Sequence, residues 1–472
     1  MLLRRWRQAT EGESQVVLLC GEPGIGKSRI TRALRESIEQ QAHTRLRYQC
    51  SPFHTQSALY PLIDQLERAA GFTKEDRAED RLDKVEALLR LALEPQEIAS
   101  IAPLFAALLS LPVERYPSLN YSPPKQKERT LDALVGQVAG LAKQRPVVIV
   151  FEDVHWVDPT THELLDPLVP RIAQLSVLFV ITYRPEYRPE WSGAPDVTVL
   201  TLNRLNRRLG AQLAAQVTSG KALPPEVLDQ IVEKTDGVPL FVEELTKHVI
   251  ESGPLSDRGD HYALAGPLST LAIPSTLRDS LMARLDRLAP VRELAQLCAV
   301  IGREFSHALI TAVSPLQEPA LTEASSQLVH SQLIFRQEVA PEASYTFKHA
   351  LVQDAAYESL LKSTRRRFHQ RVATALVERF PEEVTARPAF VAHHYTEAGL
   401  PEQAIEYWTH AGQLALQRSA NVEAISHFTK GLDLLRLVPP AHANARQELA
   451  LWLGLGPAYL ATRGFLNPSD TV

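Results

Sequence analysis

The stretch GEPGIGKS, residues 21–28, constrains the fold of this 472-residue chain more than any other feature. It fits the pattern G-x-x-x-x-G-K-[S/T], follows the apolar run QVVLLC and precedes the helical sequence RITRALRESIEQQ. Glycines let the backbone wrap around a phosphate, and the amides of residues 24–28 then converge at a helix N-terminus. A strand, a glycine-rich loop and a helix in this order predict a phosphate-binding loop beside an α/β sheet.

The residues of this loop have distinct expected roles. Lys27 is expected to reach the β- and γ-phosphates of a nucleotide, and the Ser28 hydroxyl to bind Mg²⁺. The glycines are spaced G-x-x-G-x-G, which excludes a dinucleotide-binding fingerprint. The sequence therefore predicts an ATP or ADP site with Mg²⁺, made by Gly21, Glu22, Pro23, Gly24, Ile25, Gly26, Lys27, Ser28 and Arg29.

A second polar segment, FEDVHWVD at residues 151–158, follows the apolar run PVVIV. A phosphate-binding loop needs an acidic strand end that holds the metal through water, and Glu152 occupies that position. Asp153 stands where fast P-loop ATPases commonly have a glutamate, whose extra methylene suits it to orient an attacking water. We therefore expect secure nucleotide binding and slow hydrolysis.

Other polar residues near this segment allow more than one interpretation. Arg184, just past an expected strand in ITYRPE, either reads the γ-phosphate or lies in a surface turn. His155 is either a catalytic group or a hydrogen-bonded spacer, and Trp156 is a packing residue more often than a chemical one. Asp158 could simply cap the helix that follows. The expected catalytic set is Glu152, Asp153 and Arg184.

Strands and helices alternate over residues 1–202, which predicts a P-loop ATPase core with a mainly parallel sheet. The five expected strands are 15–20, 45–50, 146–151, 176–183 and 196–202. Residues 57–112 have helical periodicity. Beyond the core we expect a helical lid at 203–252, a Gly/Pro/Ser-rich linker at 253–273, a winged-helix-like domain at 274–350 and an all-helical region at 351–472. The winged-helix-like domain is expected to have helices at 276–288, 291–301, 305–313 and 318–331 and two short strands at 333–337 and 344–349.

The tail of the chain contains a candidate repeat. Residues 452–459 fit W-x2-L-G-x2-Y, the first-helix signature of a tetratricopeptide repeat (TPR), and residues 408–428 contain a degenerate earlier copy. The alternative is an ordinary helical hairpin. The second copy lacks most of its second helix, and such arrays need several units and a cap. We therefore expect the chain to be cut from a longer protein.

Bulk composition excludes several classes of protein. A net charge of −5 over the whole chain gives no global signal for nucleic acid or a membrane surface. The three cysteines are far apart and odd in number, as in a reducing cytosol. No apolar run approaches the roughly 18–20 residues of a membrane span. These observations predict a cytoplasmic protein with neither a direct nucleic-acid partner nor a membrane partner.

Four stretches in order, GEPGIGKS, FEDVHWVD, TYRPE and TDGVPLFVEEL, resemble the origin-recognition-like AAA ATPase domain of bacterial STAND-class signalling proteins. The later stretches IPSTLRDSLMARLDRL, AVIGREF and YTFKHALVQDAAYESLL resemble the region that follows in the same proteins, so the resemblance covers nearly the whole chain. It implies a switch that ADP holds closed and ATP opens. It also implies a Walker B pair at Glu152 and Asp153, a first-sensor role for Arg184, and packing of Pro239 beside the nucleotide base.

The resemblance also implies parts that this sequence does not contain. Members carry a class III adenylate/guanylate cyclase domain ahead of the ATPase, or a LuxR-type DNA-binding domain after the repeats. An output domain is thus expected outside this chain, with protein partners or a signalling ligand for the repeats. The chain starts at Met1, inside the helix LLRRWRQA and without the usual VGRE-type motif, so part of the adenine pocket is expected to be missing.

Two other functions compete with a regulatory ATPase. The first is a DNA-binding regulator that uses the winged helix. It is disfavoured because no Lys or Arg lies between Arg303 and Arg336, and the candidate recognition helix carries Glu318 and Glu323. The second is a scaffold whose repeats bind peptides beside an inactive ATPase, and the short carboxylate of Asp153 keeps this possibility open.

Overall fold

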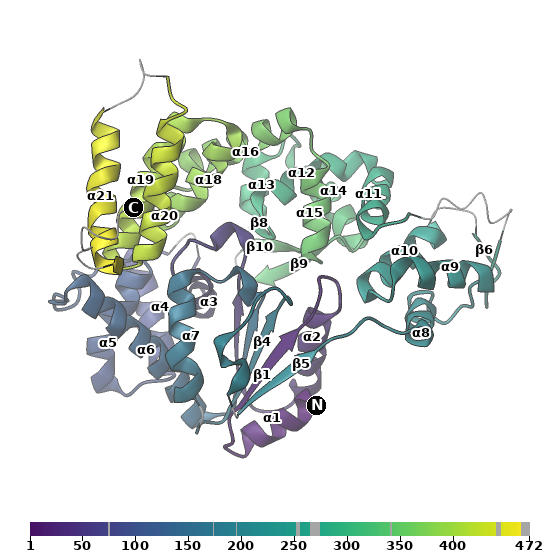
Figure 1. Cartoon of the computed structure of the whole chain (residues 1–472), viewed down its shortest axis with the longest axis horizontal. Helices are drawn as coiled ribbons and strands as arrows, with labels where there is room; N and C mark the ends of the chain where they lie inside the picture. Colours follow the sequence, from purple (N-terminus) through teal and green to yellow (C-terminus); the bar gives the residue numbers. More distant parts are fainter. Residues whose placement is uncertain are drawn as a thin grey trace, which may run out of the picture. The chain divides into compact units, whose positions relative to one another are not determined.

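The computed structural model describes residues 1–73, 76–172, 174–194, 196–251, 255–264, 274–339, 342–439 and 445–463 (Figure 1). The chain divides into two compact units. Unit one comprises Met1–Leu19, Thr31–Leu200 and His369–Val472. Unit two comprises Cys20–Ile30 and Thr201–Phe368. The phosphate-binding loop is therefore grouped with the lid rather than with most of the sheet.

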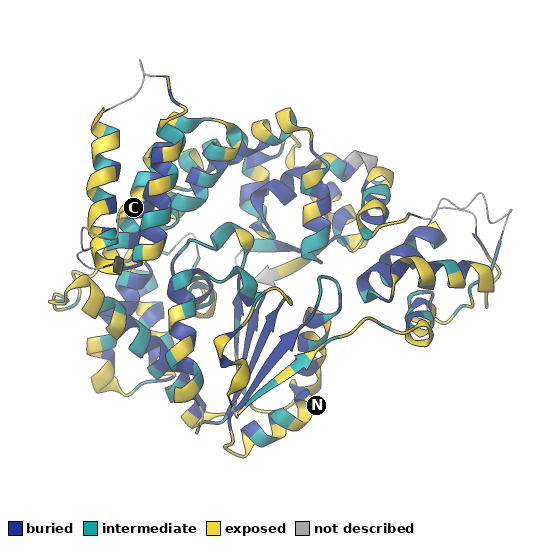
Figure 2. Ribbon diagram, viewed as in Figure 1, coloured by how far each residue is buried: buried dark blue, intermediate teal, exposed yellow. Residues whose placement is uncertain are grey.

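A five-stranded parallel sheet with the order β2-β3-β4-β1-β5 forms the centre of the ATPase core. Its strands are β1 (Gln15–Cys20), β2 (Thr44–Gln49), β3 (Val147–Glu152), β4 (Val177–Tyr183) and β5 (Val197–Thr201). All residues of β1, β3 and β4 are buried, whereas the edge strand β5 is only half-buried (Figure 2). Continuous Val, Ile, Leu and Phe runs form strands of this kind because both faces of a parallel sheet are covered by helices. The α/β prediction and all five expected strands are confirmed.

The helices of the ATPase core connect these strands and cover the sheet. They are α1 (Leu2–Thr10), α2 (Lys27–Ile38), α3 (Tyr60–Ala70), α4 (Ala78–Arg90), α5 (Pro95–Leu108), α6 (Pro123–Gln144) and α7 (Pro159–Arg171). The amphipathic α1 buries Leu2, Trp6 and Ala9 on one face. The helical pattern expected over residues 57–112 is thus three separate helices in the described part of the chain.

The segment of unit two where a helical lid is expected contains three helices, α8 (Arg207–Val217), α9 (Pro225–Thr235) and α10 (Pro239–Glu251). The following stretch departs from the expected linker, because β6 (Leu255–Asp257) and β7 (Tyr262–Leu264) pair as an antiparallel hairpin. Its Gly and Asp residues build the turn: Gly259 has φ +97° and donates its N–H to Asp257 Oδ1 at 2.9 Å. The remaining residues of the expected linker, 253–254 and 265–273, lie outside the described part.

The second half of unit two combines four helices with a small sheet. The helices are α11 (Leu277–Arg287), α12 (Ala289–Ile301), α13 (His307–Val313) and α14 (Glu318–His330). The sheet has the order β8-β10-β9, from β8 (Glu304–Ser306), β9 (Ile334–Val339) and β10 (Glu342–Phe347). The sequence predicted only two of these strands. The helix expected from residue 305 begins later because Ser306 caps it, accepting the N–H of Leu309 at 3.1 Å.

The C-terminal region is helical throughout its described residues, as expected. It comprises α15 (Ala350–Glu358), α16 (Lys362–Arg379), α17 (Pro381–Ala386), α18 (Pro388–Ala398), α19 (Pro401–Gln417), α20 (Asn421–Leu435) and α21 (Ala445–Arg463). Phe428 of α20 is fully buried between two glycines, since a Cβ on Gly412 or Gly454 would lie 2.5 or 2.3 Å from its ring. Of the helices described, none is long and apolar enough to cross a membrane.

Candidate nucleotide site

The phosphate-binding loop has the backbone shape that its glycines permit. Gly24 and Gly26 have φ values of +77° and +106°, in the left-handed region that glycine enters without a Cβ clash. A Cβ on Gly21 would lie 2.6 Å from Ile25 Cγ2. The loop then leads directly into α2, which begins at Lys27. The three glycines of the loop are therefore required by geometry, and the amides of a helix N-terminus follow them.

Lys27 is buried and its ammonium group is held inside the loop. Its Nζ donates to the carbonyl oxygens of Gly21 at 2.6 Å and Glu22 at 3.1 Å. Ser28 and Arg29 are exposed. A buried cation beside a helix N-terminus fits the phosphates of a nucleotide.

The lid contacts this loop within unit two. The N–H of Leu240, the second residue of α10, donates to Gly24 O at 3.1 Å. A Cβ on Gly24 would lie 3.1 Å from Leu240 Cβ. The structure thus brings the start of α10, where Pro239 is the first residue, against the phosphate-binding loop.

A tight turn positions the start of α10. Asp236 and Gly237 have φ values of +47° and +69°, and a Cβ on Gly237 would lie 2.1 Å from Leu205 O. Arg204 joins this turn to the loop, because it donates to Asp236 and to Glu22 Oε2 at 2.8 Å. No local sequence pattern predicted this role of Arg204, which lies 182 residues from Glu22 along the chain.

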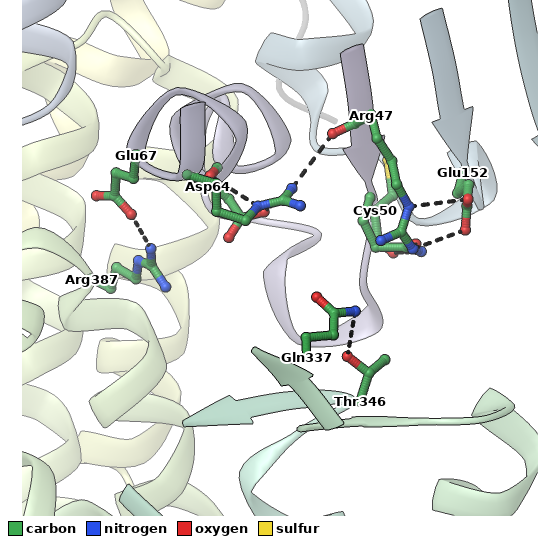
Figure 3. Close-up of polar contacts among 10 residues, drawn as sticks. Arg47, Cys50, Asp64, Glu67, Glu152, Gln337, Thr346 and Arg387 are labelled. Atoms are coloured by element: carbon green, nitrogen blue, oxygen red, sulfur yellow. Dashed lines mark hydrogen bonds and ion pairs between the residues drawn. The ribbon is translucent and has the colours of Figure 1, made fainter. Parts of the chain in front are cut away.

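Glu152 is the last residue of β3 and is buried, with 6% of its surface exposed. The guanidinium of Arg47 on β2 donates two hydrogen bonds to the Glu152 carboxylate, from Nε to Oε1 at 3.2 Å and from Nη2 to Oε2 at 3.3 Å (Figure 3). A carboxylate held by two such bonds is fixed in orientation. Each oxygen keeps a second lone pair, so Glu152 can still accept from metal-bound water.

Asp153 leaves the strand in an unusual backbone conformation. Its φ of +59° lies in the left-handed region, which costs a residue other than glycine about 1 kcal/mol. The Thr182 hydroxyl on β4 accepts its N–H at 3.0 Å, and Gln49 Nε2 donates to its Oδ2 at 3.3 Å. Two neighbouring strands therefore hold this strained residue in place, as is common at functional sites.

Arg184 and Trp156 lie together beyond the strand ends. The guanidinium carbon of Arg184 is 5.7 Å from the centroid of the Trp156 ring, a cation–π contact. The ring of His155 lies 5.2 Å from that of Trp156 in a tilted arrangement. Trp156 therefore orients Arg184. The structure gives His155 a place beside this pair and no catalytic contact in the described residues.

Asp158 caps α7, as predicted, and does more. Its Oδ1 accepts the N–H of Thr161 at 2.8 Å and the N–H of Leu59, 99 residues away, at 2.9 Å. Its Oδ2 accepts the Thr161 hydroxyl at 2.6 Å. Burial raises the pKa of Asp158 to about 7, and the negative charge of Glu423 adds to the rise.

Glu423 comes from α20 of the C-terminal helices. Its Oε1 accepts the N–H of Thr160 in the first turn of α7 at 2.9 Å, and both residues are only 1% exposed. Burial raises the pKa of Glu423 as well. Within unit one, the C-terminal helices are therefore docked on the segment that begins at Asp153. No local sequence signal reveals a contact between residues 263 positions apart.

The expected site residues fall into two groups in different compact units. The loop and Pro239 belong to unit two, and Glu152, Asp153 and Arg184 belong to unit one. Among the described residues, no group of three or more His, Cys, Asp or Glu side chains could hold a metal ion alone. Mg²⁺ needs no such group when it binds phosphates and one or two side chains.

Parts of this chain are similar to known proteins. An uncharacterised protein of Rhizobium meliloti (strain 1021) is 30% identical over 465 residues, covering 97% of this chain and 44% of the relative. The chain thus spans less than half the length of that relative. A solved structure of a Thermotoga maritima RuvB variant is 13% identical and covers 76% of this chain and 93% of that chain, with a TM-score of 0.30. Residues 1–181 match the family described as AAA ATPase domain, so the N-terminal part of the chain carries an AAA ATPase domain.

Proposed function

We propose that this chain is the nucleotide switch of a STAND-type signal-transduction ATPase acting in the cytoplasm. Mg-ATP and Mg-ADP bind at the loop of residues 21–28. The C-terminal helices form a TPR-like array that receives a protein or small-molecule signal. The nucleotide state controls an output domain outside this chain, either a class III adenylate/guanylate cyclase or a transcriptional regulator.

The docking of α20 on α7 carries this proposal. Glu423 contacts the helix that begins six residues after Asp153, so a movement of α20 is transmitted to the acidic end of β3. Both Glu423 and Asp158 are buried carboxylates, and two such charges repel each other at short range. This joint suits an element that holds the ATPase closed until a signal pulls the array away.

The residues of the site favour slow turnover. Lys27 and the amides at the start of α2 would hold the phosphates, and Glu152 would hold Mg²⁺ through water, with the metal neutralising phosphate charge when bound. The short side chain of Asp153 is hydrogen-bonded to Gln49, which restrains the group expected to orient the attacking water. Pro239 positions the lid beside the loop, and Arg184, stacked on Trp156, is available for the γ-phosphate. Binding is thus favoured over rapid hydrolysis.

Lys27→Ala tests the nucleotide site directly. We expect calorimetry to show a loss of ATP and ADP affinity of about 100-fold or more, since a charge-assisted contact to the phosphates is removed. Lys143→Ala, an exposed lysine in the last turn of α6, is the control and should bind as wild type. Equal nucleotide affinities of the two variants would contradict the assignment of the nucleotide site to residues 21–28.

Turnover separates the switch from an inactive scaffold. Wild-type protein should hydrolyse ATP slowly, and Asp153→Asn should abolish that activity while retaining nucleotide binding. Wild-type protein that binds no nucleotide would support the scaffold, and brisk turnover in Asp153→Asn would show that another residue orients the water.

The winged-helix-like domain that we propose for residues 274–350 is not expected to bind DNA. Its helix α14 carries Glu318 and Glu323, and Glu318 Oε1 is within hydrogen-bond distance, 2.8 Å, of His307 Nε2. An acidic helix is repelled by phosphates.

A further inference from the structure

A cavity lies between the ATPase core and the C-terminal helices, entirely within unit one. Helix α3 and the end of α5 form one side, and α18, α19 and α20 form the other. Its space is about 570 Å³, including the part open to solvent. Most of its lining is apolar, with Ile63, Leu108, Leu109, Pro388 and Leu414 among the contributors.

Two arginines line this mostly apolar cavity, and in the described residues only one of them forms an ion pair. Arg387 Nη2 pairs with Glu67 Oε2 at 2.7 Å (Figure 3). The guanidinium carbon of Arg387 lies 5.3 Å from the centre of the Tyr60 ring. This pair is complete, and it fixes the junction of α3 and α18.

Arg418 is the second cation, and it forms no ion pair in the described residues, although the charge of Glu67 in the same lining partly offsets the effect of burial on its pKa. Its Nη2 donates to Leu108 O at 3.0 Å and Ser110 Oγ at 2.9 Å, both uncharged acceptors. Its Nε is buried without a hydrogen-bond partner, and no described carboxylate forms an ion pair with it. Burial lowers the pKa of Arg418 to about 10, so it stays protonated at neutral pH.

His427 adds a second unsatisfied atom to the lining. It is 3% exposed and stacks on Trp408 with ring centroids 5.3 Å apart. It bonds to the backbone of Gln56, and its buried Nδ1 has no partner. Burial lowers the pKa of His427 to about 3, so the imidazole is neutral and Nδ1 is a hydrogen-bond acceptor, which a carboxylate does not satisfy.

We propose that this cavity binds a small amphipathic carboxylate, with its anionic group on Arg418 and its apolar body against α5 and α19. The buried N–H of Arg418 Nε lacks an acceptor, which is costly, and a carboxylate that accepts from it is correspondingly favoured. The charge of the lining excludes a cationic ligand. Such a ligand would touch both sides of the core–helix junction, and its signalling role, but not its binding, rests on the proposed function.

Three probes with the same six-carbon chain test this site in the wild-type chain. Hexanoate, hexan-1-ol and hexylammonium are titrated by calorimetry, with thermal shift as a second readout. Hexanoate should bind at least about 10-fold more tightly than hexanol, because a charge-assisted bond is added, and hexylammonium should not bind. Equal binding by all three, or no binding by hexanoate, would overturn the proposal.

Two variants locate the binding. Arg418→Gln should reduce hexanoate affinity to that of hexanol, whereas Arg436→Gln, an exposed arginine at the end of α20, should have no effect. Ala389→Leu fills the lining at a half-buried position and should weaken hexanoate and hexanol alike. Hexanoate affinity unchanged in folded Ala389→Leu, or in Arg418→Gln, would place the binding elsewhere. Nucleotide affinity should be unchanged in all three variants, so failure here is distinct from failure of the nucleotide site.

Discussion

Glu244 and Glu423 are both buried carboxylates on helices, but one is paired with a cation and the other lies near a second acid. Glu244 of α10 is bonded by the guanidinium of Arg284 on α11, with Lys247 at 3.8 Å. Glu423 of α20 meets the Thr160 N–H and lies near a second carboxylate, Asp158. In the described residues, no ion pair involves Glu423.

The difference separates a fixed joint from one that can open. The Arg284–Glu244 joint holds α10 to α11 with a compensated charge, and breaking it would leave the buried carboxylate with the more distant Lys247, at 3.8 Å. The Glu423 joint gains one hydrogen bond and suffers the desolvation of two acids, so little free energy opposes its release at neutral pH. We infer that the joint of Arg284 with Glu244 is built for rigidity and the joint of Glu423 with Thr160 for movement.

The largest expected effect is on the fixed joint. Arg284→Met should lower the free energy of unfolding by about 3–5 kcal/mol, because the partner of a buried charge is removed. Urea denaturation at pH 7 measures it. The control is Arg278→Met on the same helix, whose pair with Glu358 is exposed and should contribute less than about 1 kcal/mol. Similar losses for the two variants would contradict the distinction.

The next effect concerns the joint that can open. The folded-state pKa of Asp158 is raised from 3.8 to about 7, so the folded protein holds this proton more tightly than the unfolded chain. The stability from this group is full below about pH 4 and is lost as pH rises through about 7. Three pKa units set an upper bound of about 4 kcal/mol.

Asp158→Asn should remove this pH dependence. The substituted amide can still accept the N–H groups of Leu59 and Thr161 and can donate to the Thr161 hydroxyl. Unfolding at pH 8 should therefore require more free energy in the variant than in wild type, with the difference shrinking towards pH 4. A variant that is less stable at pH 8 would show that the negative charge is needed.

The smallest effect has the opposite dependence on pH. Burial alone would raise the pKa of Glu243, but hydrogen bonds from Lys247 at 2.7 Å and Lys348 at 2.5 Å lower it to about 2. The stability that the Glu243 carboxylate contributes to the fold is present above about pH 4.5 and is lost as pH falls towards 2. Because Glu243 is 29% exposed, Glu243→Gln should destabilise by only about 1–2 kcal/mol at pH 7. A larger deficit at pH 3 than at pH 7 would refute this assignment.

The sequence predicted what local patterns encode. Apolar runs gave the five strands, and the glycines of residues 21–28 gave the loop, because both depend on consecutive residues. The Asp158 cap was also readable, since its main partner lies three residues away. The hairpin β6–β7 was missed because its Gly and Asp residues suggested a linker when they form a turn.

The partners of the acidic segment could not be read in the same way. Arg47 and Thr182 reach Glu152 and Asp153 from neighbouring strands, 105 and 29 residues away. Glu423 reaches α7 from a helix that the sequence marks only as part of a repeat. Single-chain periodicity indicates that a helix has a buried face, but it does not say what that face contacts.

The release of ADP measures the central claim most directly. Glu423→Ala removes the acceptor of the buried Thr160 N–H, Glu423→Gln retains an acceptor oxygen, and Glu406→Ala changes an exposed glutamate on α19. We predict that bound fluorescent ADP, chased with excess ATP, leaves Glu423→Ala about 3–10-fold faster than wild type, since the loss of about one buried hydrogen bond loosens the joint. Glu423→Gln and Glu406→Ala should release it at close to the wild-type rate. Identical release from wild type and a fully helical Glu423→Ala protein would contradict the claim that α20 holds the nucleotide switch closed.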